Sequence, residues 1–202
     1  MGVGALHPAV AAPLNDVVTE RLSLRRLSRD DLDELAAIFT NAEVWHFEYG
    51  RGLTQSETEA FLDRQLRLWA ECGFGGCGVR EVTLPDLIGV VGLAVPNALA
   101  ELLPAVTIGW RFSPTMWRKG YATEAATALL NQAFTTMALD RVGCVTNATN
   151  LRSVRVAERL GLSLITQANL PSDDRTRMVQ ASLFQIARDD WLSAHTDQST
   201  RT

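Results

Sequence analysis

The sequence contains a single lysine, three cysteines and three histidines in 202 residues, and it has no long uninterrupted apolar run. Without such a run, no segment reaches the length of a transmembrane helix. Basic residues are not in excess, because 19 lysines and arginines stand against 23 aspartates and glutamates. The net charge of −4 argues against a general nucleic-acid-binding protein, which is usually basic. We therefore expect neither a membrane nor a nucleic acid as a partner.

The cysteines are too few and too isolated for a disulfide framework or a zinc site. Cys72 and Cys77 form a close pair, but neither a second pair nor a nearby histidine accompanies them, and Cys144 stands alone. We therefore expect no metal site. Reduced structural thiols are the default for a cytoplasmic protein, and a cytoplasmic location is the expectation here.

Length and composition favour one domain. Hydrophobic residues make up 47% and charged residues 21% of the chain, as in an ordinary globular protein with a sizeable core. Residues 1–17 are rich in alanine, proline and glycine but lack a basic start, so they predict a flexible leader and not a signal peptide. We expect a single domain over residues 18–195 and a frayed tail over residues 196–202.

Apolar periodicity predicts a mixed α/β chain. Ser28 caps one expected helix, and a second begins near Thr54, where Glu57 completes a capping box, and ends in residues 73–78. Further helices are expected over residues 120–139, 150–160 and 187–194. Seven strands are expected, over residues 21–26, 79–83, 87–95, 104–112, 142–146, 162–166 and 179–186. Short connections between residues 79 and 112 predict an antiparallel meander, whereas the helix at 120–139 predicts a parallel crossover.

The sole lysine, Lys119, lies in a turn between an expected strand and the longest expected helix. The free N–H groups at a helix start carry partial positive charge and can hold a phosphate group. Gly120 lets the backbone approach an anion closely, and Arg118 and Lys119 add positive charge. Neither glycine-rich nucleotide-binding motif is present. By itself the turn indicates an anion site only weakly, and a purely structural turn is the alternative interpretation.

The turn continues into the helix as Trp117-Arg118-Lys119-Gly120-Tyr121-Ala122-Thr123-Glu124-Ala125. This segment resembles the acetyl-CoA loop of the GCN5-related N-acetyltransferase (GNAT) family, in the form typical of its RimJ/RimL-like branch. Segments at residues 19–25, 87–92, 108–110 and 150–162 resemble the same branch in the same order. The resemblance implies a GNAT-like fold: a central, mostly antiparallel twisted sheet of about seven strands, flanked by helices and splayed between the fourth and fifth strands.

The resemblance also implies acetyl-CoA as co-substrate and direct transfer of the acetyl group to a primary amine within a ternary complex. The pantetheine arm would pair with the fourth strand, the loop would hold the pyrophosphate, and Asn150 would hydrogen-bond the arm. Ser153 is the implied proton donor to the departing thiolate; helix capping is the alternative interpretation of both Asn150 and Ser153. The implied cofactor-binding residues are Trp110, Arg111, Phe112, Trp117, Arg118, Lys119, Gly120, Tyr121, Ala122, Thr123, Asn150 and Ser153.

The acceptor side is implied to lie between the first two helices. His46 is a candidate general base because histidine titrates near neutral pH, although packing beside Trp45 and Phe47 is the plainer interpretation. Glu48 is a candidate ligand for the positive charge of the acceptor. A protein N-terminus and a small-molecule amine both stay open as acceptors, and a homodimer stays open as the assembly.

Two departures from the family pattern support an alternative function. Arg118 stands where the loop usually has glycine, so the loop is either less open or does not need a positive φ there. Thr107 stands where many relatives carry a glutamate that acts as a base or orients water. The alternative is a non-catalytic module that binds acyl-CoA as a sensor or scaffold.

Overall fold

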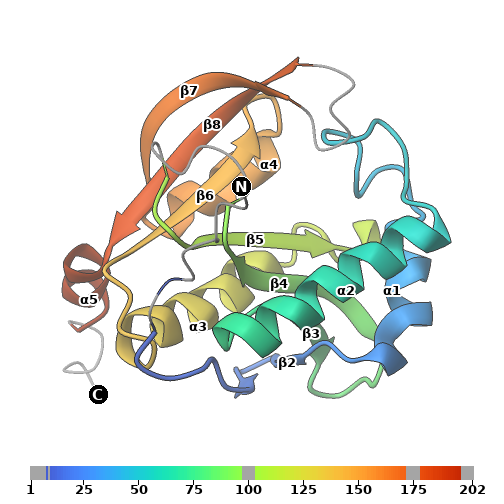
Figure 1. The fold of residues 1–202 in the computed structure, drawn as a ribbon, viewed down its shortest axis with the longest axis horizontal. Coiled ribbons are helices and arrows are strands. Elements are labelled where there is room, and N and C mark those ends of the chain that lie inside the picture. Colours follow the sequence, from blue (N-terminus) through green and yellow to red (C-terminus); the bar gives the residue numbers. More distant parts are fainter. Residues whose placement is uncertain (1–7, 9, 97–102, 172–177, 197–202) are drawn as a thin grey trace, which may run out of the picture.

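A computed structural model describes residues 8, 10–96, 103–171 and 178–196. It shows a mixed α/β fold, in which the described strands form one eight-stranded sheet of order β1-β2-β3-β4-β5-β6-β8-β7 (Figure 1). The strands are β1 (Val17–Val18), β2 (Leu22–Arg26), β3 (Gly76–Glu81), β4 (Leu87–Ala94), β5 (Thr107–Phe112), β6 (Arg141–Asn147), β7 (Ser163–Pro171) and β8 (Met178–Ala187). Every pairing is antiparallel except β5 with β6, which confirms the expected fold class.

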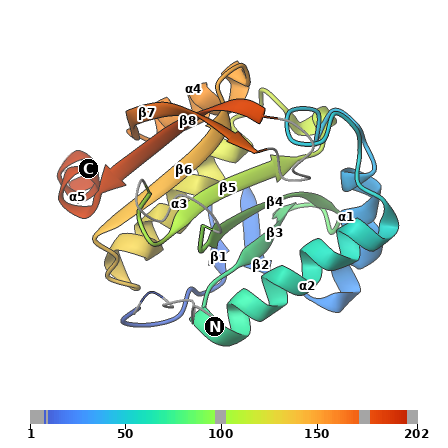
Figure 2. The same cartoon turned by 45° about the horizontal axis from the view of Figure 1, so that its top comes forward.

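Helices cover both faces of this sheet. The helices are α1 (Leu32–Phe39), α2 (Gln55–Cys72), α3 (Tyr121–Thr135), α4 (Leu151–Arg159) and α5 (Arg188–Thr196). Helices α1 and α2 lie on the face opposite α3, as Figure 2 shows. The small side chains of Ala125, Ala126 and Ala133 are completely buried, so α3 lies close against β4 and β5. This close packing holds the start of α3 next to the end of β5.

Strands β5 and β6 separate after a single paired position. Among the described residues, their register consists of Thr107 opposite Gly143, where the Gly143 N–H donates to the Val106 carbonyl at 2.9 Å. Backbone groups of alternate strand residues point to the same side, so Ile108, Trp110 and Phe112 direct theirs toward the gap. On its other side β5 pairs with β4 along its whole length. The expected splay between the fourth and fifth strands corresponds to this gap.

Several expected boundaries were wrong for local reasons. Strand β3 begins at Gly76 and not at residue 79, because only Gly73, in a left-handed conformation, ends α2. Helix α3 ends at Thr135 and not at residue 139, because Ala138 adopts a φ of 58° that no helix continues. The eighth strand, β1, has two residues and too short a pattern for periodicity to detect.

Part of the expected leader packs against the domain. Leu14 is buried in the main core, and its N–H donates to the Gly73 carbonyl at 2.9 Å. The Ala11 N–H donates to the Met137 carbonyl at 2.9 Å, and Gln132 bonds both backbone groups of Asn15. These contacts order residues 10–16 across the ends of α2 and α3. Residues 1–7 and 197–202, in the expected leader and tail, lie outside the described residues.

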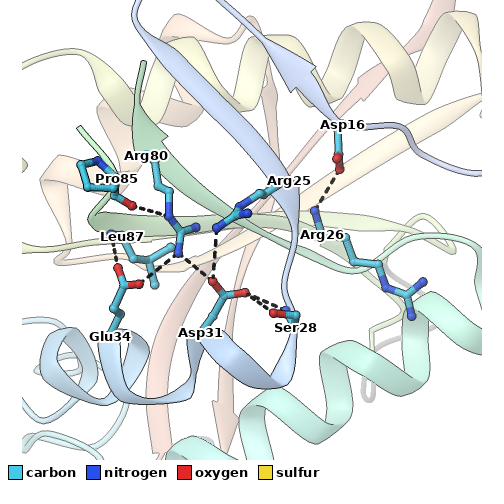
Figure 3. A network of polar contacts seen from close by, with 9 residues as sticks. All are labelled: Asp16, Arg25, Arg26, Ser28, Asp31, Glu34, Arg80, Pro85 and Leu87. Atoms are coloured by element: carbon cyan, nitrogen blue, oxygen red, sulfur yellow. Dashed lines mark hydrogen bonds and ion pairs between the residues drawn. The ribbon is translucent and has the colours of Figure 1, made fainter. Parts of the chain in front are cut away.

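A buried ion pair joins β3 to the start of α1. One nitrogen of the Arg80 guanidinium, Nη2, lies 2.7 Å from Asp31 and 3.2 Å from Glu34, while Nε donates to the Pro85 carbonyl at 2.6 Å (Figure 3). Ser28 donates its N–H to the other Asp31 oxygen at 2.7 Å. Side chains of Arg80 and Asp31 are 8% and 5% exposed, so this pair is largely removed from water.

The three cysteines are buried free thiols, and burial raises the pKa of Cys77 and Cys144 to about 12. Such thiols stay protonated and unreactive at neutral pH. Within the described ranges, none of the helices is long and apolar enough to cross a membrane.

Candidate functional site

The turn between β5 and α3 contains two left-handed residues in close succession. Arg118 has a φ of 65° and Gly120 a φ of 84°, so the position where the family usually has glycine does adopt the glycine-like conformation. The turn therefore does need a positive φ at this position, and Arg118 adopts it at a steric cost that glycine would not have. Gly120 then caps α3 without a side chain, which leaves the first helical N–H groups pointing out of the turn.

Helix α4 faces this turn across the gap. The Asn150 side chain caps α4 by accepting the Ser153 N–H at 3.3 Å, so its capping role is real. The Arg152 guanidinium lies 4.0 Å from the centre of the Trp117 ring, and the Trp117 indole donates to the Phe112 carbonyl at 2.9 Å. Arg152 and Trp117 thus link α4 to the end of β5.

A cavity of about 330 Å³ opens where the turn, the end of β5, the start of α4 and the segment after α1 meet. Twelve of the fourteen residues singled out from the sequence line it: Glu48, Trp110, Arg111, Phe112, Trp117, Arg118, Gly120, Tyr121, Ala122, Thr123, Asn150 and Ser153. They come from segments up to about a hundred residues apart in the chain, so the fold gathers all but one of the expected cofactor-binding residues, together with Glu48, in one place.

Lys119 and His46 are not among the residues that line the cavity in the described chain. Lys119 is exposed, with its ammonium 3.3 Å from the Met116 sulfur. His46 is exposed too, and its ring contacts Phe47 edge-on at 5.1 Å. The candidate role of His46 as general base therefore gains no support from the geometry, and the plainer interpretation of a surface or packing residue fits its position.

An ion pair lies at the end of the cavity beside the segment after α1. Arg111 on β5 donates from Nη2 to Glu48 Oε1 at 2.7 Å, and its guanidinium lies 4.7 Å from the Trp45 ring centre. Its Nη1 bonds the Trp110 carbonyl at 2.9 Å. The buried Arg111 Nε has no hydrogen-bond partner within the described structure. Since Glu48 and Arg111 are 23% and 28% exposed, the pair is partly desolvated and fixed in place.

Sequence reasoning missed several lining residues. They are Glu43, Val44, Phe47, Met116, Arg152, Arg155, Val156 and Arg159. The arginines of α4 recur at spacings of three and four residues, which places them on one helical face. That periodicity could have found them, but arginines on a short exposed helix are more often a solvated surface.

The cavity has two electrostatic ends. Arg118 of the turn and three arginines of α4 line the cavity from the side of α3 and α4, and Glu43 and the Glu48–Arg111 ion pair line it from the segment after α1 and β5. One end suits a phosphorylated ligand and the other a cationic one. In the described part of the chain, no group of three or more His, Cys, Asp or Glu side chains is placed to hold a metal ion.

Known proteins share this architecture. A putative ribosomal-protein-serine acetyltransferase from Vibrio cholerae superposes with a TM-score of 0.70 at 25% identity, over 87% of this chain and 99% of that one. A spermidine N-acetyltransferase from Vibrio cholerae, solved with CoA and spermine, gives a TM-score of 0.69 at 18% identity over 86% and 99% of the two chains. At such identity the second likeness concerns the fold alone.

The amino-acid sequence is also similar to those of known acetyltransferases. An uncharacterized N-acetyltransferase of Bacillus subtilis, YoaA, is 29% identical over 145 residues, which cover 71% of this chain and 80% of that protein. The sequence model of the acetyltransferase (GNAT) domain matches residues 21–163, and the chain belongs to this family of acetyltransferases.

Proposed function

We propose that this protein is an acetyl-CoA-dependent N-acetyltransferase that transfers an acetyl group directly to a primary amine. The observation that carries the proposal is the single cavity in which an anion-binding helix start, an unpaired strand side and an acidic end meet. A binding module would need the first two features but not the acidic end.

The residues present fit acetyl-CoA. The first N–H groups of α3, at Tyr121, Ala122 and Thr123, suit the pyrophosphate, with Arg118 beside them. The gap-facing N–H groups of Trp110 and Phe112, two residues that line the cavity, suit a pantetheine arm, whose amide carbonyls can accept hydrogen bonds as in a short strand. Acetyl-CoA supplies an activated thioester carbonyl, and an N–H donor of β5 beside that carbonyl would stabilise the charge that develops on its oxygen.

Glu48 and Ser153 take different parts in the proposed reaction. Glu48, held by Arg111, attracts the ammonium of the acceptor, which must lose a proton before its nitrogen can attack. As the new C–N bond forms, the C–S bond breaks and the departing thiolate needs a proton. Ser153 lies on the α4 face that lines the cavity and supplies this proton. The first proton of the acceptor passes to water, and the proton that the nitrogen loses as it becomes an amide restores the Ser153 hydroxyl through water.

The RimJ/RimL-like character of the turn favours a protein N-terminus as acceptor. The likeness to a ribosomal-protein-serine acetyltransferase, at 25% identity, supports this choice, whereas the likeness to the spermidine enzyme concerns the fold alone. We favour the N-terminal amine, because the turn segment carries the branch pattern and the identity is higher for the ribosomal-protein enzyme.

A coupled assay tests the proposal. CoA binding is measured by calorimetry, and release of free thiol from acetyl-CoA is followed with peptides bearing a free N-terminal serine or alanine and with spermidine. We expect CoA binding, and thiol release that depends on one of these amines. CoA binding without thiol release for any amine would contradict catalysis and favour the binding module.

Gly120→Ala tests the place of the pyrophosphate. Alanine at a φ of 84° strains the turn, so CoA affinity should fall by at least about tenfold. Gly161→Ala is a matched control, since Gly161 has a φ of 77° and lies outside the cavity lining of the described chain. Equal CoA affinities in the two variants would refute this assignment.

A further inference from the structure

Arg21, the residue before β2, and Glu124, in the first turn of α3, are hydrogen-bonded to each other beside the turn between β5 and α3. Arg21 Nε donates to Glu124 Oε2 at 2.7 Å, and the Arg21 N–H donates to Glu124 Oε1 at 3.1 Å. The Thr19 hydroxyl donates to the same Oε1 at 2.6 Å. Arg21, Glu124 and Thr19 thus form one hydrogen-bonded group, which we call the Arg21 clamp.

The clamp reaches the backbone between the two left-handed residues. Arg21 Nη1 donates to the Lys119 carbonyl at 3.1 Å. A Cβ added at Gly120 would stand 3.4 Å from Arg21 Nη2, so the guanidinium lies directly against the turn. Since Arg118 and Gly120 flank the bonded carbonyl, Arg21 holds the backbone where it is most strained.

Tyr121 extends the clamp to a third element. The Arg21 guanidinium lies 4.8 Å from the centre of the Tyr121 ring, and the Tyr121 hydroxyl donates to Glu81 Oε1 on β3 at 2.6 Å. The first residue of α3 is therefore tied to both β2 and β3.

The clamp itself does not face the ligand space. Among the described residues, neither Arg21 nor Glu124 nor Thr19 lines the cavity, whereas Arg118, Gly120 and Tyr121 do. The positive charge of Arg21 is balanced at short range by Glu124. Burial by itself would raise the pKa of Glu124, but the hydrogen bonds from Thr19 and Arg21 outweigh it and lower the pKa, which keeps the carboxylate ionised.

We propose that Arg21 and Glu124 are positioning residues that preorganise residues 118–121 for the acyl-CoA pyrophosphate. The inference rests on the proposed function, because it assigns a ligand to this turn. A strained turn that is already held in its binding conformation does not have to be ordered when the ligand arrives. The clamp thus acts on affinity for the cofactor and not on the chemical step.

Arg21→Gln tests the inference, with Arg51→Gln as a matched control. Arg51 also pairs with a glutamate through two bonds, of 2.7 and 2.8 Å, and also donates to a backbone carbonyl, but it serves the start of α2. We expect Arg21→Gln to weaken CoA binding by about tenfold and to raise the KM for acetyl-CoA with little change in kcat. Arg51→Gln should leave CoA affinity as it is.

Two further variants separate geometry from charge. Arg21→Lys keeps the positive charge but cannot form the fork of bonds to Glu124 and Lys119, so it should lose as much affinity as Arg21→Gln. In the double variant Arg21→Gln/Glu124→Gln, the loss of CoA affinity should match that of Arg21→Gln alone, because the two residues act as one unit. Wild-type affinity in Arg21→Lys would overturn the clamp in favour of a simple charge effect.

Amide hydrogen exchange, measured without ligand, tests the effect of the clamp on the turn independently of cofactor binding. We expect faster exchange of the Glu124 amide, which bonds the Gly120 carbonyl at 3.0 Å, in Arg21→Gln than in Arg51→Gln. Unchanged exchange together with unchanged CoA affinity would overturn the inference. Faster exchange in a protein whose wild type binds no CoA would support the clamp as a brace but refute its ligand and the proposed function.

Discussion

At the scale of the residue, Arg118 combines a backbone cost with a side-chain contribution. A non-glycine residue at a φ of 65° costs about 1 kcal/mol. The same side chain lines the cavity beside the proposed pyrophosphate site. The residue is therefore expected to lower stability and raise ligand affinity together.

Arg118→Gly should separate the two effects. We expect the free energy of unfolding to rise by about 1 kcal/mol, or roughly 2–4 °C in Tm, and CoA affinity to fall. Ala138→Gly is the control, since Ala138 has a φ of 58° at the far end of α3. It should give a similar stabilisation without affecting CoA. An increase in CoA affinity for Arg118→Gly would mean that the arginine obstructs the turn.

Ser153→Ala tests the proposed proton donor. We expect kcat to fall by roughly 100-fold, with a much smaller change in the KM for acetyl-CoA, because general-acid catalysis acts on the transition state. The exposed Ser163 offers a control, and Ser163→Ala should retain full activity. A change confined to KM would show that Ser153 only binds the cofactor, consistent with its place one turn after the Asn150 cap.

Residues that act locally could be predicted from the sequence, and residues that act across the fold could not. Gly120 and Asn150 were recognisable because each begins a helix. Arg21 and Glu124 meet across 103 positions of the chain, and nothing in either segment signals the partner. The Glu48–Arg111 pair was hidden in the same way, since its members are 63 positions apart.

At the scale of the element, helix beginnings were predicted better than ends. The capping box of α2 is present as expected: Glu57 accepts the Thr54 N–H at 2.8 Å, and Thr54 accepts the Glu57 N–H at 3.2 Å. The end of α3 depends on Ala138, a residue type that normally continues a helix. Met137 and Leu139 on either side of it are both buried in the core, and local propensity contains no information on such packing.

The joint between β3 and α1 should depend on its buried ion pair. Arg80→Met would leave the Asp31 carboxylate buried without its main partner, and we expect a loss of about 3 kcal/mol in urea unfolding. Arg25 lies 4.0 Å from the same carboxylate but is 54% exposed, so Arg25→Met should cost less than about 1 kcal/mol. Similar losses in both variants would contradict the role assigned to burial.

At the scale of the whole molecule, three carboxylates make the free energy of unfolding depend on pH. Burial alone would raise the pKa of Asp31, but hydrogen bonds from Ser28 and Arg80 outweigh it and lower the pKa. The Arg51 hydrogen bond, with those of Thr54, lowers the pKa of Glu57 to about 2. Glu124 is lowered as well. In each case the folded protein holds its proton less tightly than the unfolded chain does.

Stability should therefore be fully present above the ordinary titration range of carboxylates and decline as the pH falls from about 5 toward 2. Urea unfolding over that range measures the decline, and Glu57→Gln should make the curve less steep. A free energy of unfolding that stays constant between pH 5 and pH 3 would contradict the native-state ionisation of these groups.

The gap between β5 and β6 also bears on aggregation. A strand with unpaired backbone groups is normally a hazard, because a strand of another chain can add to it. Here the side that faces the gap belongs to Ile108 and Trp110, which are only 2% and 9% exposed and lie in the middle of the sheet, and the Trp110 carbonyl already accepts a hydrogen bond from Arg111. Helix α4 and the Trp117 ring border the space beside it. The sheet thus keeps an edge that a slender ligand can occupy while the surrounding structure bars a second polypeptide.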